Sequence, residues 1–284
     1  MGTGLISARG SLGHVARYAP GKPIEEVQRE LGLTHVVKLA SNENAYGCSP
    51  KAAKAVAEEM AKAALYPESV SPRLAEKLVF VCNPNNPTGT IVGADALRRF
   101  IECVPARVLV VVDEAYYEYV TSADYLQTIP LLGAHPNLVV LRTFSKIYGL
   151  AGLRIGYGAM HPDVASVLHK VRGPFNTSRL AQAAALASLD DADFAAMCRE
   201  QNAQERDRVA RSLAEMGLRV YLSETHFLLF EVPGSGEEVA HRLLRHGVIV
   251  RAGEGLGAPG TVRVSLGTPE ENDAFLRALT HSME

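Results

Sequence analysis

The stretch VFVCNPNNPTG at residues 79–89 joins a strand-forming apolar run to a cluster of turn-forming Asn, Pro and Gly residues. Two later stretches have the same form, VLVVVDEAY at 108–116 and LVVLRTFSK at 138–146. The apolar runs 108–112 and 138–141 show no alternation, as expected for strands covered on both faces. These stretches predict three buried strands that each end in polar side chains.

Strands and helices are predicted to alternate along most of the chain. The remaining strands are expected at 153–157, 227–232, 248–251 and 262–266, and the helices at 50–64, 94–103, 162–171, 179–216, 236–246 and 269–279. This alternation favours an α/β fold with a mainly parallel sheet. Too few residues separate Leu141 from Leu153 for a crossover helix, so strand 153–157 should run antiparallel to its predecessor.

Two domains are expected. The predicted helix 179–216 is long enough to leave one domain and enter another. The strands after it are short and separated by Gly-rich turns, which favours a smaller α+β domain. We therefore predict a large domain over 36–189, and a second domain built from the N-terminal arm 1–35 and residues 190–284.

One junction conflicts with ordinary chain geometry. SPRLAEKL at 71–78 has a helical pattern, and a predicted buried strand follows it without any Gly, Asn or other turn residue. Connections between a helix and a strand usually take roughly 2–6 residues. The sequence therefore predicts that a segment is missing between Leu78 and Val79, either as residues omitted from the sequence or as a genuine deletion.

Composition excludes several classes of protein. With 47% hydrophobic and 21% charged residues, the 284-residue chain is unlike disordered, collagenous or coiled-coil proteins. The formal net charge is -2 and no basic block occurs, so neither nucleic acid nor a membrane surface is an expected partner. No apolar run could span a bilayer, and residues 1–10 do not have the pattern of an export signal. The four cysteines form no CxxC pair, which favours reduced thiols in the cytoplasm and disfavours structural zinc.

Polar side chains at the strand ends are the candidate functional residues. Asn86, Asp113, Tyr116 and Lys146 follow three successive strands, and ligands of open α/β sheets bind outside the carboxyl ends of the strands. Taken singly, each has an ordinary explanation as a turn residue, a helix cap or a solvated lysine. Their succession on three strand ends favours one shared crevice.

These residue types match the chemistry of pyridoxal phosphate. A partly desolvated lysine has a lowered pKa, so its amine can attack a carbonyl. A carboxylate can keep a ring nitrogen protonated, in a pair worth roughly 4 kcal/mol at an effective dielectric of about 20 and a separation of about 4 Å. Tyr and Asn can hydrogen-bond a phenolic oxygen, while Arg and hydroxyl groups can hold a phosphate.

The chain resembles the fold-type I pyridoxal-phosphate aminotransferases, and most closely the histidinol-phosphate aminotransferase family. The matching motifs are KLASNEN at 38–44, NPNNPTG, DEAY, TFSKIYGLAGLRIGY at 143–157 and RVSLGT at 263–268. Aromatic-amino-acid aminotransferases and threonine-phosphate decarboxylases share these motifs, so they specify the fold and cofactor better than the substrate.

The resemblance implies a role for each cofactor-binding residue. Lys146 would be the Schiff-base lysine and proton shuttle, Asp113 would pair with the pyridinium nitrogen, and Tyr116 and Asn86 would hydrogen-bond the phenolic oxygen. The residues implied to hold the cofactor phosphate are Thr143, Ser145, Arg154 and, from across a dimer interface, Tyr66.

The resemblance also implies substrate contacts and one loss. Arg263 would bind the anionic end of the substrate, and Tyr18 and Asn44 would line its pocket. In the family, a block at the Leu78–Val79 junction supplies a helix N-terminus for the cofactor phosphate and an aromatic residue that stacks on the ring. Without this block, cofactor affinity should fall.

The implied protein is a cytoplasmic homodimer with shared active sites. It would exchange amino groups between histidinol phosphate and 2-oxoglutarate, with glutamate as the amino-acid partner, by ping-pong chemistry. Two alternatives remain open: an aromatic-amino-acid aminotransferase, and a catalytically silent, truncated protein of the same fold.

Overall fold

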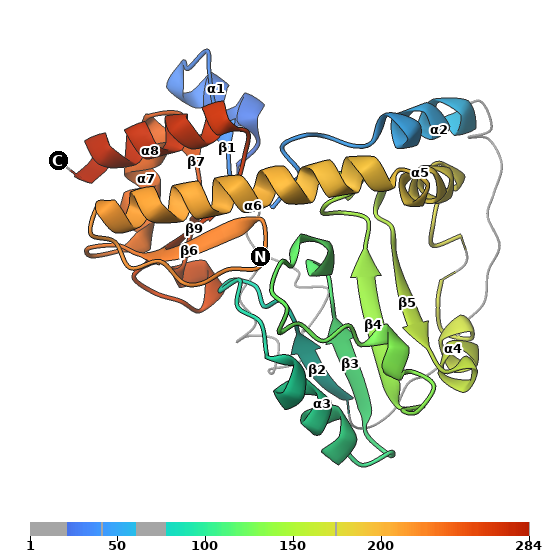
Figure 1. The fold of residues 1–284 in the computed structure, drawn as a ribbon. Helices are drawn as coiled ribbons and strands as arrows, with labels where there is room; N and C mark the ends of the chain where they lie inside the picture. The colour runs from blue at the N-terminus through green and yellow to red at the C-terminus, as the bar shows by residue number, and fades with distance from the viewer. Residues whose placement is uncertain (1–21, 41, 61–77, 174, 284) are drawn as a thin grey trace, which may run out of the picture.

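The computed structural model describes residues 22–40, 42–60, 78–173 and 175–283. Its elements form two groups that lie at either end of the long helix α6 (Ala192–Glu215), as Figure 1 shows. One group is built on a four-stranded sheet and the other on a three-stranded sheet.

The four-stranded sheet contains the three strands predicted first, but the prediction that all three are buried is wrong for the strand at 78–82. This strand lies at the edge of the described sheet, and its side chains alternate between exposed and half-buried. The order of the sheet is β2 (Leu78–Cys82), β3 (Leu109–Asp113), β4 (Leu138–Thr143) and β5 (Gly156–Met160). The first three are parallel neighbours, and β5 is antiparallel to β4, which confirms both predictions. The fourth strand starts three residues later than predicted, because residues 151–153 form a short 3-10 turn.

One face of this sheet packs on the helix α3 (Ala94–Cys103). Leu97 and Ile101 of α3 pack with Val110 and Val112 of β3, and all four side chains are buried. Burial of each such side chain contributes roughly 1.5–3 kcal/mol. The helix α4 (Pro162–His169) follows β5 and begins with a proline, a residue preferred at the first helical position.

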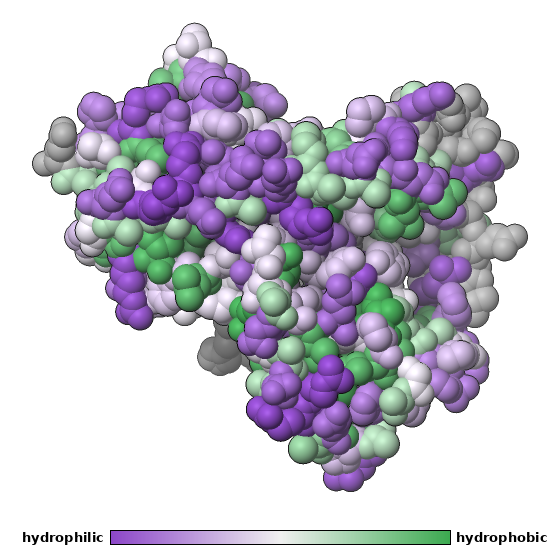
Figure 2. All heavy atoms as spheres, in the orientation of Figure 1, coloured by the Kyte–Doolittle hydropathy of each residue, from purple (hydrophilic) through white to green (hydrophobic). Residues whose placement is uncertain are grey.

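The predicted single helix 179–216 is wrong, because two helices occupy this range. α5 (Arg179–Leu189) ends before Asp190, and α6 starts at Ala192. The Ser49 hydroxyl hydrogen-bonds the Asp191 carboxylate, and Lys51 Nζ donates to the Asp190 carbonyl over 2.6 Å. Both contacts come from the start of α2 (Pro50–Met60), which packs against α5, so tertiary contacts fix the break. Hydrophilic side chains cover much of the outer face of α6 (Figure 2).

The second group has an antiparallel sheet of order β6 (Phe227–Glu231), β9 (Thr261–Ser265) and β8 (Arg251–Ala252). The helices α7 (Gly236–Arg245) and α8 (Pro269–Met283) pack with it in the largest apolar core. No helix in the described ranges is both long and apolar enough to cross a membrane.

A short parallel pair extends the second group. β1 (Val37–Lys38) pairs with β7 (Val248–Ile249), and the helix α1 (Ile24–Leu31) precedes β1. The strand predicted at 248–251 is therefore divided between two sheets, as β7 and β8. The predicted domain boundary at residue 36 also separates β1 from the strand with which it pairs.

Candidate active site

The ends of β2, β3 and β4 meet at one edge of the sheet. Cys82 lies beside Asp113, and Asp113 lies beside Leu141. Main-chain bonds continue past the strands, since Asn83 N donates to the Asp113 carbonyl over 3.0 Å and Glu114 N donates to the Leu141 carbonyl over 2.9 Å. The structure thus brings the motifs NPNNPTG, DEAY and TFSK together.

Lys146 is a half-buried lysine whose amine lies near an aromatic ring. Its Nζ lies 5.5 Å from the centroid of the Tyr116 ring. Burial lowers the pKa of Lys146, and the charges of Arg263 and Arg154 lower it further. A lowered pKa increases the fraction of neutral amine, which is the nucleophilic form.

Asp113 is partly buried at the same edge of the sheet, and we call the region around Asp113, Tyr116 and Lys146 the crevice. One Asp113 carboxylate oxygen accepts a hydrogen bond from Ala115 N over 3.0 Å. Burial nevertheless raises the pKa of Asp113, although this bond and the charge of Lys146 act in the opposite direction. Since desolvation dominates, a cationic group placed against this carboxylate would be strongly favoured.

Tyr116 is held by Asn42, a residue to which the sequence assigned no individual role. Asn42 Nδ2 donates to the Tyr116 hydroxyl over 3.3 Å, and Asn42 Oδ1 accepts from Ser265 Oγ over 2.5 Å. Burial raises the pKa of Tyr116, which keeps its hydroxyl protonated. Asn42 has φ 52°, a left-handed conformation that Asn tolerates better than most residues, and its place in the KLASNEN motif is the sequence signal that could have pointed to it.

Arg263 reaches from the second sheet to the NPNNPTG motif. Its Nη1 donates to Asn86 Oδ1 over 2.5 Å, and its Nη2 donates to the Ala40 carbonyl over 3.1 Å. The structure therefore brings Asn86 and Arg263, two predicted site residues, into direct contact.

Arg251 is a further candidate that sequence reasoning missed. It lies directly opposite Arg263 in the β8–β9 pair, so both side chains leave the sheet on the same face. Two neighbouring guanidinium groups are suited to a dianion such as a phosphate monoester. Only the strand register reveals this pairing, because 12 positions separate the two residues in sequence.

Three of the four predicted phosphate-binding residues lie at the end of β4 or in the segment that follows it. Thr143 Oγ1 accepts from Ser145 N over 3.0 Å, and Ser145 is buried. Arg154 has a left-handed backbone with φ 54° and donates to the Ala151 carbonyl over 2.7 Å. Arg154 is exposed, and its charge contributes to lowering the pKa of Lys146.

Asn44 holds the lysine loop in place. Its amide donates to the carbonyl of Ile147, the residue after Lys146, over 2.7 Å. Gly149, with φ 68°, lets this loop pack closely, because a Cβ there would lie 2.0 Å from the Gly47 carbonyl oxygen. Tyr18 and Tyr66 lie outside the described residues.

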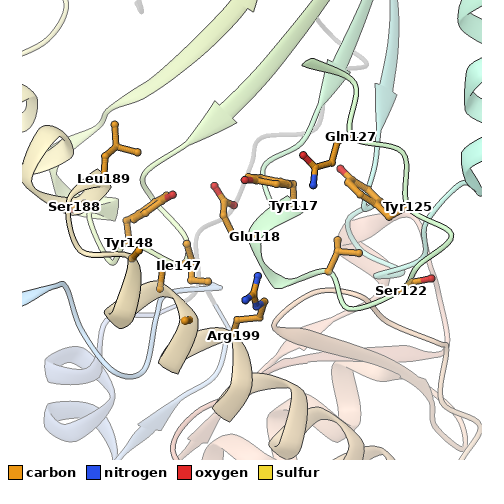
Figure 3. Close-up of a pocket in the computed structure, with 14 residues that line it drawn as sticks. Tyr117, Glu118, Ser122, Tyr125, Gln127, Ile147, Tyr148, Ser188, Leu189 and Arg199 are labelled. Carbon is orange, nitrogen blue, oxygen red and sulfur yellow. The ribbon is translucent and has the colours of Figure 1, made fainter. Parts of the chain in front are cut away.

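A separate pocket lies behind the lysine loop. Figure 3 shows Glu118 between Tyr117 and Tyr148 in this pocket, which Arg199 of α6 also lines. Both carboxyl oxygens of Glu118 are buried and have no hydrogen-bond partner within the described ranges, and burial raises its pKa to about 8. Neither Lys146 nor Asp113 lines this pocket, so it is distinct from the crevice.

No described group of three or more His, Cys, Asp or Glu residues could hold a metal ion.

Comparisons with known proteins identify the family of the chain. The profile of the aminotransferase class I and II family matches residues 68–279. The histidinol-phosphate aminotransferase of Brevibacillus brevis is 39% identical over 343 residues, covering 92% of this chain and 94% of the relative. That of Bacillus subtilis strain 168 is 38% identical over 344 residues, covering 92% and 96%.

Solved structures show the same fold. The histidinol-phosphate aminotransferase of Sinorhizobium meliloti, solved in complex with pyridoxal-5'-phosphate, aligns with a TM-score of 0.83 at 24% identity and covers 99% of both chains. A Thermus thermophilus aspartate aminotransferase double mutant aligns with a TM-score of 0.78 at 17% identity, covering 98% of this chain and 100% of the other. The chain therefore belongs to the class I and II aminotransferases and, within them, to the histidinol-phosphate aminotransferase family.

Proposed function

We propose that the chain is a pyridoxal-phosphate-dependent aminotransferase that exchanges amino groups between histidinol phosphate and 2-oxoglutarate in histidine biosynthesis. The observation that carries this proposal is the partly desolvated amine of Lys146 beside Tyr116 and Asp113, at the ends of three neighbouring strands. The names of the curated relatives support the substrate.

The residues of the crevice fit the cofactor. Asp113 would hold a proton at the ring nitrogen, and the protonated Tyr116 hydroxyl would donate to the phenolic oxygen. The groups available for the cofactor phosphate are Thr143, Ser145 and Arg154. When bound, the cofactor supplies an electron sink for the electrons of the substrate's Cα–H bond.

The chain's own residues would then bind substrate and move its proton. Lys146 Nζ, with its lowered pKa, would accept the Cα proton and deliver it to the former aldehyde carbon of the cofactor, so that the amino group stays with the cofactor. Arg263 and Arg251 would hold the anionic end, which is a phosphate in histidinol phosphate and a carboxylate in glutamate.

An aromatic-amino-acid aminotransferase is the second candidate, because its motifs are shared and the aromatic ring of Phe227 lies against Tyr116, edge-on. Rates of the first half-reaction with histidinol phosphate and with phenylalanine separate the two. We expect a higher kcat/KM for histidinol phosphate, and a preference for phenylalanine would reject the proposed substrate.

We also propose a cytoplasmic homodimer with shared active sites, to which Tyr66 and Tyr18 would contribute. All four cysteines are free thiols, as expected in a reducing compartment. The domain division stays a proposal, with β1 assigned to the second group because it pairs with β7.

We propose, finally, that an internal block is missing at the Leu78–Val79 junction. The alignment with the Brevibacillus brevis relative spans 343 residues, whereas 92% of this 284-residue chain is only about 261 residues. About 80 residues of the relative therefore have no counterpart here. An intact mass near 30.5 kDa would mean that the deletion is genuine, and would favour the catalytically silent alternative. A clearly larger mass would show that the block is present in the protein, and it would support the proposed aminotransferase activity.

A further inference from the structure

His226 is a fully buried histidine beside the crevice that the proposed reaction does not use. It precedes β6 and is 3% exposed. Its ring stacks on Tyr119 with centroids 4.7 Å apart and an interplanar angle of 20°, and it lies 5.6 Å from the Tyr116 ring at 38°. The ring therefore fills the space between two tyrosines, of which one carries the hydroxyl assigned to the cofactor.

The surroundings of His226 keep its ring neutral. Burial lowers the pKa of His226 to about 3, and the charges of Lys146 and Arg263 act in the same direction, while the Asn42 backbone opposes them. Neither ring nitrogen has a partner in good hydrogen-bond geometry within the described part of the chain, although the Asn42 backbone is close enough to act on the pKa. A polar ring without partners costs stability when it is buried, so packing alone does not favour histidine here.

Tyr116 belongs to a buried cluster with Tyr119, Ile147 and Phe227, and His226 lies against both of its tyrosines. The Tyr116 hydroxyl is held by Asn42 over 3.3 Å, and the Tyr116 ring meets Phe227 edge-on at 5.3 Å. A small cavity is lined by Tyr119, Cys198 and His226 but not by Tyr116. Loss of the His226 ring would let the tyrosines move into this space.

We propose that His226 is a positioning residue, whose neutral ring holds the Tyr116 hydroxyl in place for the cofactor's phenolic oxygen. The inference rests on the proposed function, because it assigns that oxygen as the partner of Tyr116. In this proposal, His226 fixes the position of Tyr116 and makes no contact with the substrate.

The test measures the cofactor and not turnover. The cofactor-loaded protein is titrated with acid and base, and the apparent pKa of the cofactor's visible absorbance is compared between variants. We expect His226→Asn to shift this pKa in the same direction as Tyr116→Phe, by about half a unit or more. The double variant should shift no further than Tyr116→Phe alone, because both changes act on one contact.

His226→Phe keeps a flat ring of similar shape and should leave the apparent pKa near that of the unchanged protein. His241→Asn changes an exposed histidine of α7 and serves as the matched control. If His226→Asn does not fold, His226→Leu carries the same expectation, because it keeps the volume without the flat ring.

An unshifted pKa in His226→Asn or His226→Leu, or additive shifts in the double variant, would overturn the inference. Failure of the proposed function is distinguishable, because the unchanged protein would then show no visible cofactor absorbance.

Discussion

At the scale of the residue, adjacency to strand ends explains which side chains could be predicted. Lys146, Asp113 and Tyr116 follow apolar runs within a few positions, so their convergence follows from parallel strand order. Asn42 and Arg251 could not be found this way, because a left-handed backbone and a cross-strand register place them.

Glu118 allows a residue-scale prediction about stability. Its pKa is about 8 in the folded protein and near 4.5 when exposed, so folding favours the protonated carboxyl. The contribution of the protonated carboxyl to the free energy of unfolding is fully present below about pH 4.5, and it is lost as pH rises through about 8. At pH 9, Glu118→Gln should therefore be more stable than the unchanged protein by about 1–3 kcal/mol, with the difference disappearing near pH 4.

Urea unfolding at pH 4, 7 and 9 measures this difference. Glu102→Gln, at an exposed position of α3, is the matched control and should change little at any pH. Equal midpoints for Glu118→Gln and the unchanged protein at pH 9 would show that Glu118 is ionised without penalty.

At the scale of the element, most strands and helices could be predicted from hydrophobic patterns. The break between α5 and α6 could not, since contacts from Ser49 and Lys51, more than 130 positions away, stabilise the non-helical Asp190 and Asp191. The split of 248–251 into two strands likewise depends on distant partners, β1 and β9.

The register between β8 and β9 leads to a prediction about substrate binding. Arg251 and Arg263 leave the sheet on one face, so both should contact the substrate's anionic end. Arg251→Gln should lower kcat/KM for histidinol phosphate by about 10- to 100-fold, as expected for the loss of hydrogen bonds to a charged group. Steady-state kinetics check this, with Arg98→Gln on the exposed surface of α3 as control. An unchanged kcat/KM would remove Arg251 from the site.

At the scale of the whole molecule, the crevice lies where the two groups of elements meet. Arg263 of β9 binds Asn86, which follows β2, and Ser265 of β9 binds Asn42. No pattern within one segment predicts such contacts, because they depend on how the two groups pack. The resemblance of the motifs to a family was therefore needed to assign Arg263.

The sheet edge at β2 leads to a prediction about the 284-residue chain. Phe80 is 63% exposed and Leu78 is 47% exposed on an edge strand, as expected if an internal block normally covers them. Exposed apolar edge strands pair with other chains, and lysine at such an edge opposes pairing. Phe80→Lys should therefore reduce aggregation more than Leu222→Lys, although Leu222 is 89% exposed in a loop. Light scattering after size-exclusion chromatography measures the aggregate, and equal effects of both variants would count against this account.

The central claim is that the Lys146 amine forms the covalent link to pyridoxal phosphate. Borohydride reduction of the cofactor-loaded protein fixes that link, and peptide mapping by mass spectrometry identifies the modified lysine. We predict a single pyridoxyl group on Lys146, and none on any lysine of the variant Lys146→Ala. A pyridoxyl group on a different lysine of the unchanged protein would contradict the account.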